Sequence, residues 1–481
     1  MVLRFYNTRI RSKGEFEALH GSKVGLYACG PTVYHYAHIG NYRAYVTWDV
    51  LHRLLERRKF KLTHVMNITD VGHLQSDADD TEDKMERAAR EEKKSPQQIA
   101  EFYTHAFMQD MEKLHVIRPA IICKATDHIP EMIKLIQKLE KKGFTYSTGD
   151  GVYFNVEKFK SYGKFAGIAL DQLKGVREEV NRDPGKKHPA DFRLWQLNQP
   201  SHALQWDSPW GRGYPGWHIE CSAMAMKYLG DRFDIHTGGM DNLFPHHQNE
   251  IAQSEGATGK PFANFWMHVT FMLVNGQKMS KSLRNTYTIA DLEKKGFEGL
   301  DFRYLLLTAH YKSEMNFTWD SLEAARKTRK GWNDFIQRLQ KYKGKKTSEA
   351  ATNFMMNDLQ KDHFERIEGF LDDDLNTPMV LAQLFEIQKA VNGYMDREEF
   401  SKSDTRKILE YLKDINEVLD VFEFDQPIHS IPAHVVKLGQ ERDAARKAKD
   451  WKKADSLRGA LTKEGYSIVD TKDGFEIIPL G

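Results

Sequence analysis

One alternation near the start of the chain limits the possible folds more than any other feature. The apolar run Val24–Cys29 reads as a strand, and residues 30–41 form a loop that contains glycine and proline. Tyr42–Arg58 carries apolar residues at helical spacing, and Lys61–Thr69 reads as a second strand. Strand, glycine-containing loop, helix and strand form the opening unit of a parallel α/β sheet. Ligands of such sheets bind at the carboxyl ends of the strands.

His38 and Gly40 lie in that loop, just before the expected helix. A histidine there can donate a hydrogen bond to a phosphate, since helix N-termini favour anions. Glycine has no side chain, so a flat base can approach the backbone at residue 40. A turn with a solvated histidine is the simpler interpretation of His-x-Gly, and the motif taken alone favours it.

A second stretch, residues 216–250, contains candidate metal ligands. Cys221 offers a soft thiolate, and the i, i+4 spacing of His246 and Glu250 puts them on one face of a helix. A structural zinc site has four protein ligands, so one further ligand is needed besides these three. Cys29 is the better candidate for the fourth, because it ends the first strand just before a glycine turn. The alternatives are an apolar buried cysteine and a solvated His–Glu pair.

Composition excludes several classes of protein. The chain has 481 residues, 40% of them hydrophobic, which suits about two to four domains. Its 70 basic and 68 acidic residues leave a net charge of +2, so only a local patch can favour a nucleic acid. Three cysteines exclude a disulfide framework. With neither a signal-peptide core nor an apolar run of about 18 residues, we expect a cytoplasmic protein with no membrane partner.

The middle of the chain adds a second candidate loop. Ser76–Lys94 is highly charged and is expected to be an exposed loop, and residues 118–215 read as an insertion. Residues 266–274 read as one strand that turns at Asn275-Gly276, a strong hairpin signal. The loop Lys278-Met279-Ser280-Lys281-Ser282 follows. Its lysines can hold a polyphosphate, or they are ordinary solvated charges.

The end of the chain is helical and charged. A linker is expected at Pro427–Pro432, and Glu441–Thr462 reads as one basic helix. Tyr466–Asp470 and Phe475–Ile478 read as a small hairpin. This tail is the best local basic face of the chain and suits a polyanionic partner.

Two short motifs, taken together, resemble a known enzyme family. His38-Ile39-Gly40-Asn41 and Lys278–Ser282 resemble the two signatures of class I aminoacyl-tRNA synthetases. Further segments along nearly the whole chain look like cysteinyl-tRNA synthetases in particular: Cys29–Tyr34, Asn67–Asp70, Gly216–Met224, Phe244–Glu250, Asp372–Pro378 and Asp450–Asp455.

The sequence departs from that family pattern at two positions. Asn41 replaces the last histidine of the first signature, and Thr237 stands where glycine is common. An asparagine can still donate a hydrogen bond to ATP, so neither departure argues against the activity.

The resemblance implies an α/β protein with a Rossmann-type parallel-sheet catalytic domain, an insertion, a helical bundle and a small α/β tail. The expected division is 1–117 for the first half of the catalytic domain, 118–215 for a connective insertion, 216–290 for the second half with the zinc site and signature loop, 291–430 for a stem-contact region and helical tRNA-binding bundle, and 431–481 for a small anticodon-binding tail.

The resemblance also implies a reaction and its residues. L-cysteine would be activated with ATP and Mg²⁺ and then transferred to the 3′ end of tRNA-Cys, with one zinc ion per chain selecting the substrate thiol. The implied zinc ligands are Cys29, Cys221, His246 and Glu250. The implied catalytic residues are His38, Lys278 and Lys281, the ATP-binding residues are His38, Gly40, Asn41 and Lys281, and the residues that shape the amino-acid pocket are Thr32, Thr69, Trp217 and His236.

Two other functions stay open at this point. A cysteine ligase of low-molecular-weight thiol biosynthesis resembles the same catalytic half, but the basic helix after residue 440 argues against it. A non-catalytic relative that binds zinc and RNA is the second, and the intact signature lysines and all four candidate ligands argue against that. We expect a monomer, the usual state in the family.

Overall fold

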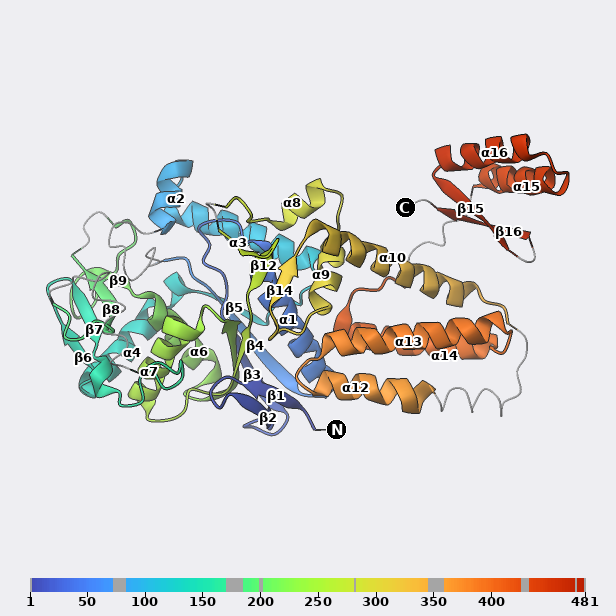
Figure 1. Cartoon of the computed structure of the whole chain (residues 1–481). Coiled ribbons are helices and arrows are strands. Elements are labelled where there is room, and N and C mark those ends of the chain that lie inside the picture. Colours follow the sequence, from blue (N-terminus) through green and yellow to red (C-terminus); the bar gives the residue numbers. More distant parts are fainter. Residues whose placement is uncertain are drawn as a thin grey trace. The chain divides into compact units, whose positions relative to one another are not determined.

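The chain folds into two compact units, Met1–Phe422 and Glu423–Gly481, each with a hydrophobic core of its own. The computed structural model describes residues 2–71, 84–169, 185–198, 202–280, 283–344, 359–424, 432–471 and 474–479. Figure 1 shows the elements of both units in chain order. Within these ranges, no helix combines the length and the apolar character that a bilayer crossing requires.

A five-stranded parallel sheet forms the centre of the first unit, in the order β11-β10-β3-β4-β5. β3 and β10 are adjacent, although the chain runs from β3 toward β5 on one side and from β10 to β11 on the other. This switch in strand order is where open parallel sheets bind ligands. The strands are β3 Lys23–Ala28, β4 Lys61–Ile68, β5 Ile121–Lys124, β10 Phe233–Gly239 and β11 Ala263–Val269.

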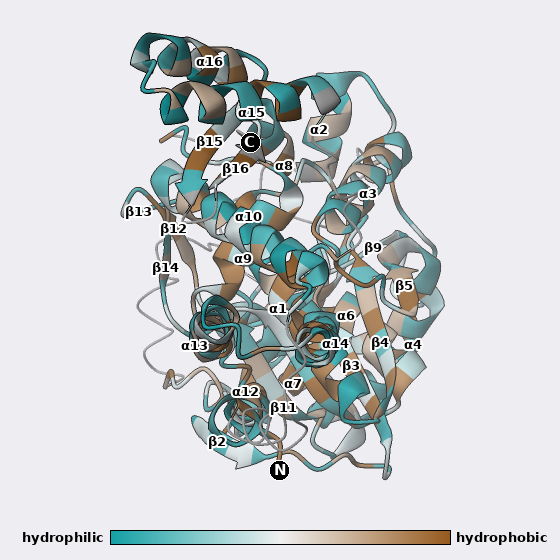
Figure 2. Ribbon diagram, turned by 90° about the vertical axis from the view of Figure 1, so that its right-hand side faces the viewer, coloured by the Kyte–Doolittle hydropathy of each residue, from teal (hydrophilic) through white to brown (hydrophobic). Residues whose placement is uncertain are grey.

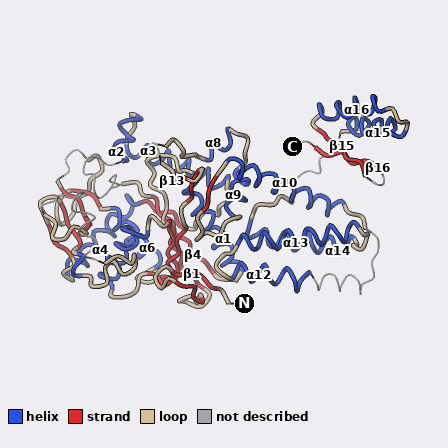
Figure 3. The backbone as a smooth tube through the Cα atoms, in the orientation of Figure 1, coloured by secondary structure: helices blue, strands red, loops and turns tan. Residues whose placement is uncertain are grey.

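Helices cover both faces of this sheet, as the alternating pattern predicts. Figure 3 shows α1 (Ile39–Arg57) on one side of the strands and α6 (Trp217–Leu229) on the other. Figure 2 shows the central strands as largely hydrophobic and α10 as largely hydrophilic. The other helices of the unit are α2 Lys84–Glu92, α3 Pro96–Lys113, α4 Ile129–Lys141, α7 Gln248–Thr258, α8 Ile289–Lys294, α9 Gly299–Leu307, α10 Trp319–Lys341, α12 Glu365–Asp372, α13 Thr377–Asp396 and α14 Lys402–Leu419.

Smaller sheets surround the central one. An antiparallel sheet in the order β6-β7-β8-β9 forms the core of the insertion, and β13-β12-β14 carries the strand before the second signature. Their bounds, with those of the N-terminal hairpin, are β1 Arg4–Asn7, β2 Ser12–Glu15, β6 Thr145–Ser147, β7 Gly151–Phe154, β8 Phe192–Leu197, β9 Gly213–Pro215, β12 Met272–Val274, β13 Gln277–Lys278 and β14 Met315–Phe317.

The second unit is a small α/β fold. It consists of α15 Ala433–Lys447, α16 Trp451–Lys463 and the antiparallel strands β15 Tyr466–Thr471 and β16 Gly474–Pro479. The predicted hairpin is confirmed, but the single helix predicted over Glu441–Thr462 is wrong. Lys449 adopts a left-handed φ of 59°, and Asp450 caps α16 by accepting a hydrogen bond from the Lys453 N–H at 3.1 Å.

Two further expectations for the first unit are corrected. The described part of Ser76–Lys94 is the helix α2, because Met85 and Ala89 pack into a core with α3; residues 76–83 lie outside the described ranges. The insertion expected from residue 118 begins later along the chain, since β5 pairs with β4 in the central sheet.

The strand predicted over residues 266–274 is also interrupted. β11 and β12 belong to different sheets, and Thr270 and Phe271 separate them. The carbonyls of both residues accept hydrogen bonds from the Arg43 guanidinium at 2.8 Å, and the Thr270 N–H donates to the Tyr311 carbonyl at 3.0 Å. The backbone groups of Thr270 therefore pair with Arg43 and Tyr311 and not with a neighbouring strand of the central sheet. The predicted hairpin at Asn275-Gly276 is confirmed.

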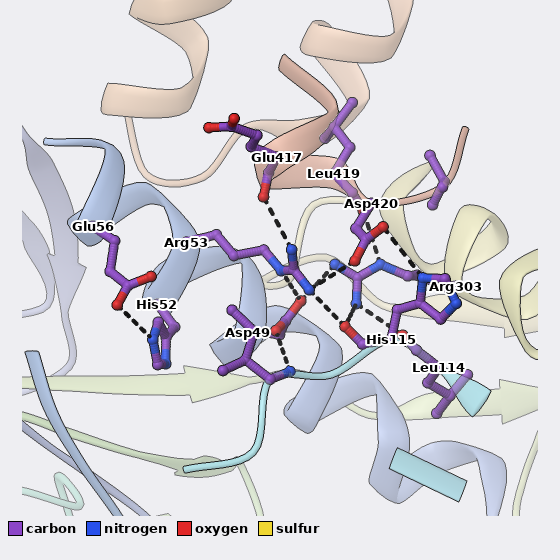
Figure 4. Close-up of polar contacts among 12 residues, drawn as sticks. Asp49, His52, Arg53, Glu56, Leu114, His115, Arg303, Glu417, Leu419 and Asp420 are labelled. Atoms are coloured by element: carbon purple, nitrogen blue, oxygen red, sulfur yellow. Dashed lines mark hydrogen bonds and ion pairs between the residues drawn. The ribbon is translucent and has the colours of Figure 1, made fainter. Parts of the chain in front are cut away.

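A buried ionic network joins α1 to α9 and to the end of α14 (Figure 4). Asp49 on α1 and Arg303 on α9 form an ion pair at 2.5 Å, and neither side chain is exposed. Arg303 also donates to the Leu419 carbonyl at 2.8 Å, at the end of α14. Arg53 binds both Asp49 and Asp420 at 2.8 Å. The network fixes α1 against α9 and the end of α14.

Replacing Asp49 by asparagine should lower the free energy of unfolding by about 3–5 kcal/mol, because Arg303 keeps a buried charge without its partner. The control is Glu410→Gln in the exposed pair with Arg406, whose side chains are 81% (Arg406) and 63% (Glu410) exposed, where at most about 1 kcal/mol is expected. Urea titration of the three proteins measures the difference. Equal midpoints for the two variants would contradict this account of the network.

Candidate active site and metal-ligand cluster

A cavity of about 650 Å³ opens beside the ends of β3 and β10 and the first turn of α1. It lies at the switch in strand order. Six residues named from the sequence line it: Cys29, Thr32, His38, Gly40, Asn41 and Trp217. The lining also includes residues at or just after the end of β10 and others that follow the second signature: Gly238, Gly239, Asp241, Asn242, Arg284, Thr286 and Thr288.

The first signature forms the N-terminal cap of α1. Nδ1 of His38 accepts a hydrogen bond from the Asn41 N–H at 3.3 Å, and the Asn41 side-chain oxygen accepts one from the His38 N–H at 3.0 Å. Burial lowers the pKa of His38, so its ring is neutral at pH 7. Because Nδ1 accepts, the proton is on Nε2, which can donate to a ligand. Asn41 thus has a capping role where the resembled signature has histidine.

Gly40 is the point where the two signatures meet. A Cβ atom at residue 40 would lie 2.1 Å from Cε of Met279 and 3.2 Å from the His38 ring. A side chain here would make at least the Met279 side chain move. The absence of a Cβ at residue 40 therefore allows the two signatures to approach closely.

Of the two signature lysines, Lys278 is among the residues that the structure describes. Lys278 is exposed on β13, with Nζ 5.8 Å from the centre of the Phe271 ring, and it is not among the residues that line the cavity. Lys281 lies outside the described residues. The phosphate-binding role of both lysines stays a prediction.

Beside the cavity, the structure brings together the four predicted metal ligands. The candidate donor atoms of Cys29, Cys221, His246 and Glu250 all lie within 4.8 Å of one another. Nε2 of His246 is 3.1 Å from Oε1 of Glu250, and both side chains are at most 1% exposed. A second, overlapping group keeps Cys29 and Glu250 but replaces the other two ligands by His236 and His247. The geometry alone therefore allows two ligand sets.

Hydrogen bonds behind the cluster orient its imidazoles. Nδ1 of His246 lies 2.9 Å from Nδ1 of His218, so its Nε2 remains for the cluster. Nε2 of His236 lies 2.9 Å from Oε2 of Glu250. Nε2 of His247 lies 3.2 Å from Sγ of Cys29, and Nδ1 of the same ring lies 2.8 Å from Nε2 of His268. Such outer partners fix the orientation of metal ligands.

The electrostatics of the cluster fit a cation. Burial raises the pKa of Cys29 and raises that of Glu250 to about 8, while burial lowers the pKa of His246 to about 3. The pKa of Cys221 is raised mainly by its hydrogen bond with Cys29 and, to a smaller extent, by burial. Without a cation these groups stay uncharged. Oε1 of Glu250 is buried without a hydrogen bond, and two thiols with an imidazole form a soft donor set of the kind zinc prefers.

The residues predicted to shape the amino-acid pocket occupy two layers. Trp217 lines the cavity and stacks on His246, with ring centres 4.2 Å apart. Thr32 lines it too and forms a β-bridge with the buried Thr69. Thr69 and His236 are not among the lining residues, and His236 stands behind Glu250. Neither of these last two residues faces the cavity, and His236 also belongs to the second possible ligand set.

Sequence reasoning missed several residues of the site. Asp241 is an exposed residue that lines the cavity, and desolvation of its carboxyl group there raises its pKa. Its signal was its place two residues after Gly239, at the carboxyl end of a parallel strand. Arg284 also lines the cavity. His218 and His268, which orient the cluster, carry no spacing signal that could have identified them.

Comparisons with known proteins identify the family of the chain. The profile of the tRNA synthetases class I (C) catalytic domain matches residues 15–327, and the DALR domain matches residues 367–423. The solved structure of Mycobacterium tuberculosis methionyl-tRNA synthetase bound by methionyl-adenylate is similar with a TM-score of 0.58 at 13% identity, over 83% of this chain and 90% of that chain. That likeness shows the fold.

Sequence relatives are closer. A cysteine–tRNA ligase of Treponema denticola is 42% identical over 98% of both chains. Those of Chlorobaculum tepidum and Chlamydia muridarum are each 41% identical, over 98% and 99% of both chains respectively. The chain therefore belongs to the cysteine–tRNA ligase family of class I aminoacyl-tRNA synthetases.

Proposed function

We propose that the protein activates L-cysteine with ATP and transfers the cysteinyl group to the 3′ end of tRNA-Cys, as a monomer in the cytoplasm. One observation carries the proposal: the buried cluster with Cys29 and Cys221 adjoins a cavity lined by the first signature. A soft donor set next to a nucleotide-sized cavity suits a thiol-bearing amino acid and ATP. Membership of the family supports the same activity.

In the first step, a carboxylate oxygen of cysteine attacks the α-phosphorus of ATP. The bond to the bridging oxygen breaks, and pyrophosphate leaves with that oxygen. The protein has to position the reactants and stabilise the phosphate charge. Nε2–H of His38 donates to a phosphate oxygen, and Lys278 and Lys281 add positive charge, with Mg²⁺ accompanying the nucleotide.

Other cavity residues hold the nucleoside part of ATP. Gly40 lets the adenine approach the backbone. Nδ2 of Asn41, which the helix cap does not use, donates to ATP. The carboxyl group of Asp241 is placed in the cavity where it can accept a hydrogen bond from a ribose hydroxyl.

Cys29, Cys221, His246 and Glu250 would hold one zinc ion, which supplies a soft Lewis acid that takes the substrate sulfur in preference to the oxygen of serine. An ordinary pocket separates such isosteres poorly. Trp217 and Thr32 shape the pocket around the substrate. Thr69 positions Thr32 through their β-bridge, and His236 positions Glu250.

In the second step, a ribose hydroxyl at the tRNA 3′ end attacks the carbonyl carbon, and AMP leaves. We assign residues 291–430 to contacts with the tRNA stem and residues 431–481 to the anticodon. Basic side chains of the second unit can neutralise phosphates: Lys447, Lys449, Lys452, Lys453 and Arg458.

Two assays test the whole proposal. Cysteine-dependent exchange of pyrophosphate into ATP is expected, and a non-catalytic binding protein would show none. Charging of tRNA-Cys is expected as well, and a ligase of low-molecular-weight thiol synthesis would show exchange without it.

The metal assignment predicts one zinc ion per chain. Cys221→Ala and His246→Ala should each lose the metal and raise the Kd for cysteine, and Glu250→Ala should lose less. Cys123→Ser is the matched control, because that buried thiol lies outside both ligand sets. Zinc content by atomic emission and cysteine binding by calorimetry are the measurements. His247→Ala separates the two sets, since retention of zinc favours Cys221 and His246. Full zinc in all variants would refute the cluster as its site.

Lys281→Ala should slow adenylate formation more than it weakens ATP binding, because its charge matters most when the pentavalent phosphate forms. A loss of about 3 kcal/mol of transition-state stabilisation is expected, as for one preorganised donor. Single-turnover kinetics and the Kd of ATP separate the two effects. Lys294→Ala, at an exposed lysine on α8, is the control. A tenfold weaker Kd with an unchanged rate would exclude this role.

Ending the chain after Ile431 should spare pyrophosphate exchange and sharply reduce tRNA charging, because the first unit remains whole. Circular dichroism must first show that the shortened protein is folded. In the full chain, Lys452→Glu with Lys453→Glu should weaken tRNA binding and reduce its dependence on salt. Undiminished charging by both proteins, or equal loss of exchange and charging, would contradict the assignment of activation to the first unit and of tRNA binding to the second.

A further inference from the structure

An exposed group of aromatic side chains lies at the rim of the cavity. His35 and Tyr36 come from the loop before α1, and Phe102 and Tyr103 come from α3, which packs beside α2 (Figure 1). We call these four residues the aromatic ledge. Tyr36 and Phe102 are 45% and 43% exposed. His35 and Tyr36 also line the cavity, so ledge and cavity form one continuous surface.

The rings of the ledge are held in fixed orientations. Tyr103 is central: its ring centre lies 5.0 Å from that of Tyr36 at an interplanar angle of 90°, and 5.1 Å from that of Phe102 at 86°. It is only 6% exposed, packs with Ile99 in a small core, and donates through its hydroxyl to Glu92. Edge-to-face contacts of this kind favour one arrangement of the rings.

A cation lies over the same surface. Nζ of Lys94 is 4.5 Å from the centre of the Phe102 ring. Its ammonium group has three donors, of which Glu92 takes one at 2.9 Å. Proteins that bind single-stranded nucleic acid combine aromatic faces, on which bases stack, with cations that meet the phosphates. Large exposed aromatic side chains beside a cavity, with a cation close by, therefore fit an unpaired nucleic-acid strand.

We propose that the aromatic ledge stacks the unpaired bases at the 3′ end of the tRNA while the terminal ribose lies in the cavity. The inference rests on the proposed function and names where that substrate's single strand lies. A cavity of about 650 Å³ admits a terminal nucleoside but not a duplex. The preceding bases must therefore cross the rim, where the exposed Phe102 ring can stack on one of them and Lys94, whose ammonium lies over that ring, can meet a phosphate.

Two substitutions at Phe102 test for stacking. Phe102→Leu keeps apolar volume without an aromatic face, and Phe102→Trp keeps the face. Both should retain wild-type pyrophosphate exchange. The leucine variant should lose about five- to fiftyfold in kcat/KM for tRNA charging, whereas the tryptophan variant should stay near wild type. Lys94→Met should weaken tRNA binding and make it less dependent on salt.

A fluorescent adenine analogue at each unpaired position of the tRNA reports stacking directly. Its emission should fall on binding to the wild type and to Phe102→Trp, and should not fall with Phe102→Leu. A purely structural role of Phe102 would not produce this difference.

The failures are distinguishable. Normal charging by Phe102→Leu would overturn the ledge and leave the activity standing, as would equal loss of charging in the leucine and tryptophan variants. Absence of cysteine-dependent exchange in the unmodified protein would overturn the proposed function itself.

Discussion

The relative position of the two signatures depends on one buried side chain. Arg43, one turn beyond His38 on α1, donates to four backbone carbonyls, those of Thr270, Phe271, His310 and Ser313. Only a guanidinium offers five donors in a planar fork. Because it binds the backbone itself, Arg43 fixes the end of β11 and the start of β12 to the helix whose first turn faces the cavity. A lysine could not satisfy four carbonyls at once.

The same helix connects the cavity with the parts that we assign to tRNA. Its first turn carries His38, and Asp49 in its middle pairs with Arg303 on α9. Arg303 in turn holds the carbonyl that ends α14. A single rigid element therefore runs from the cap that faces the cavity to the helical segment that includes the DALR match, residues 367–423.

Local patterns predicted most of this architecture, and contacts between distant residues account for the errors. Apolar patterns indicated α1 and the parallel strands β3 and β4. The break between β11 and β12 was invisible because Arg43 lies 227 residues from Thr270. In the site, ligand chemistry grouped Cys29 with Cys221, His246 and Glu250, and the structure brings them together. It could not place His236 behind Glu250, since that depends on packing.

The contact between Met279 and Gly40 has a thermodynamic consequence. A base that reaches the backbone of residue 40 meets the methionine first, because Cε occupies the space where a side chain would stand. If a base binds there as proposed, nucleotide occupancy and displacement of the Met279 side chain are linked equilibria, and linkage acts equally in both directions. Interactions that hold the Met279 side chain in place would then weaken the nucleotide's affinity, and a bound nucleotide would shift the population toward a displaced side chain.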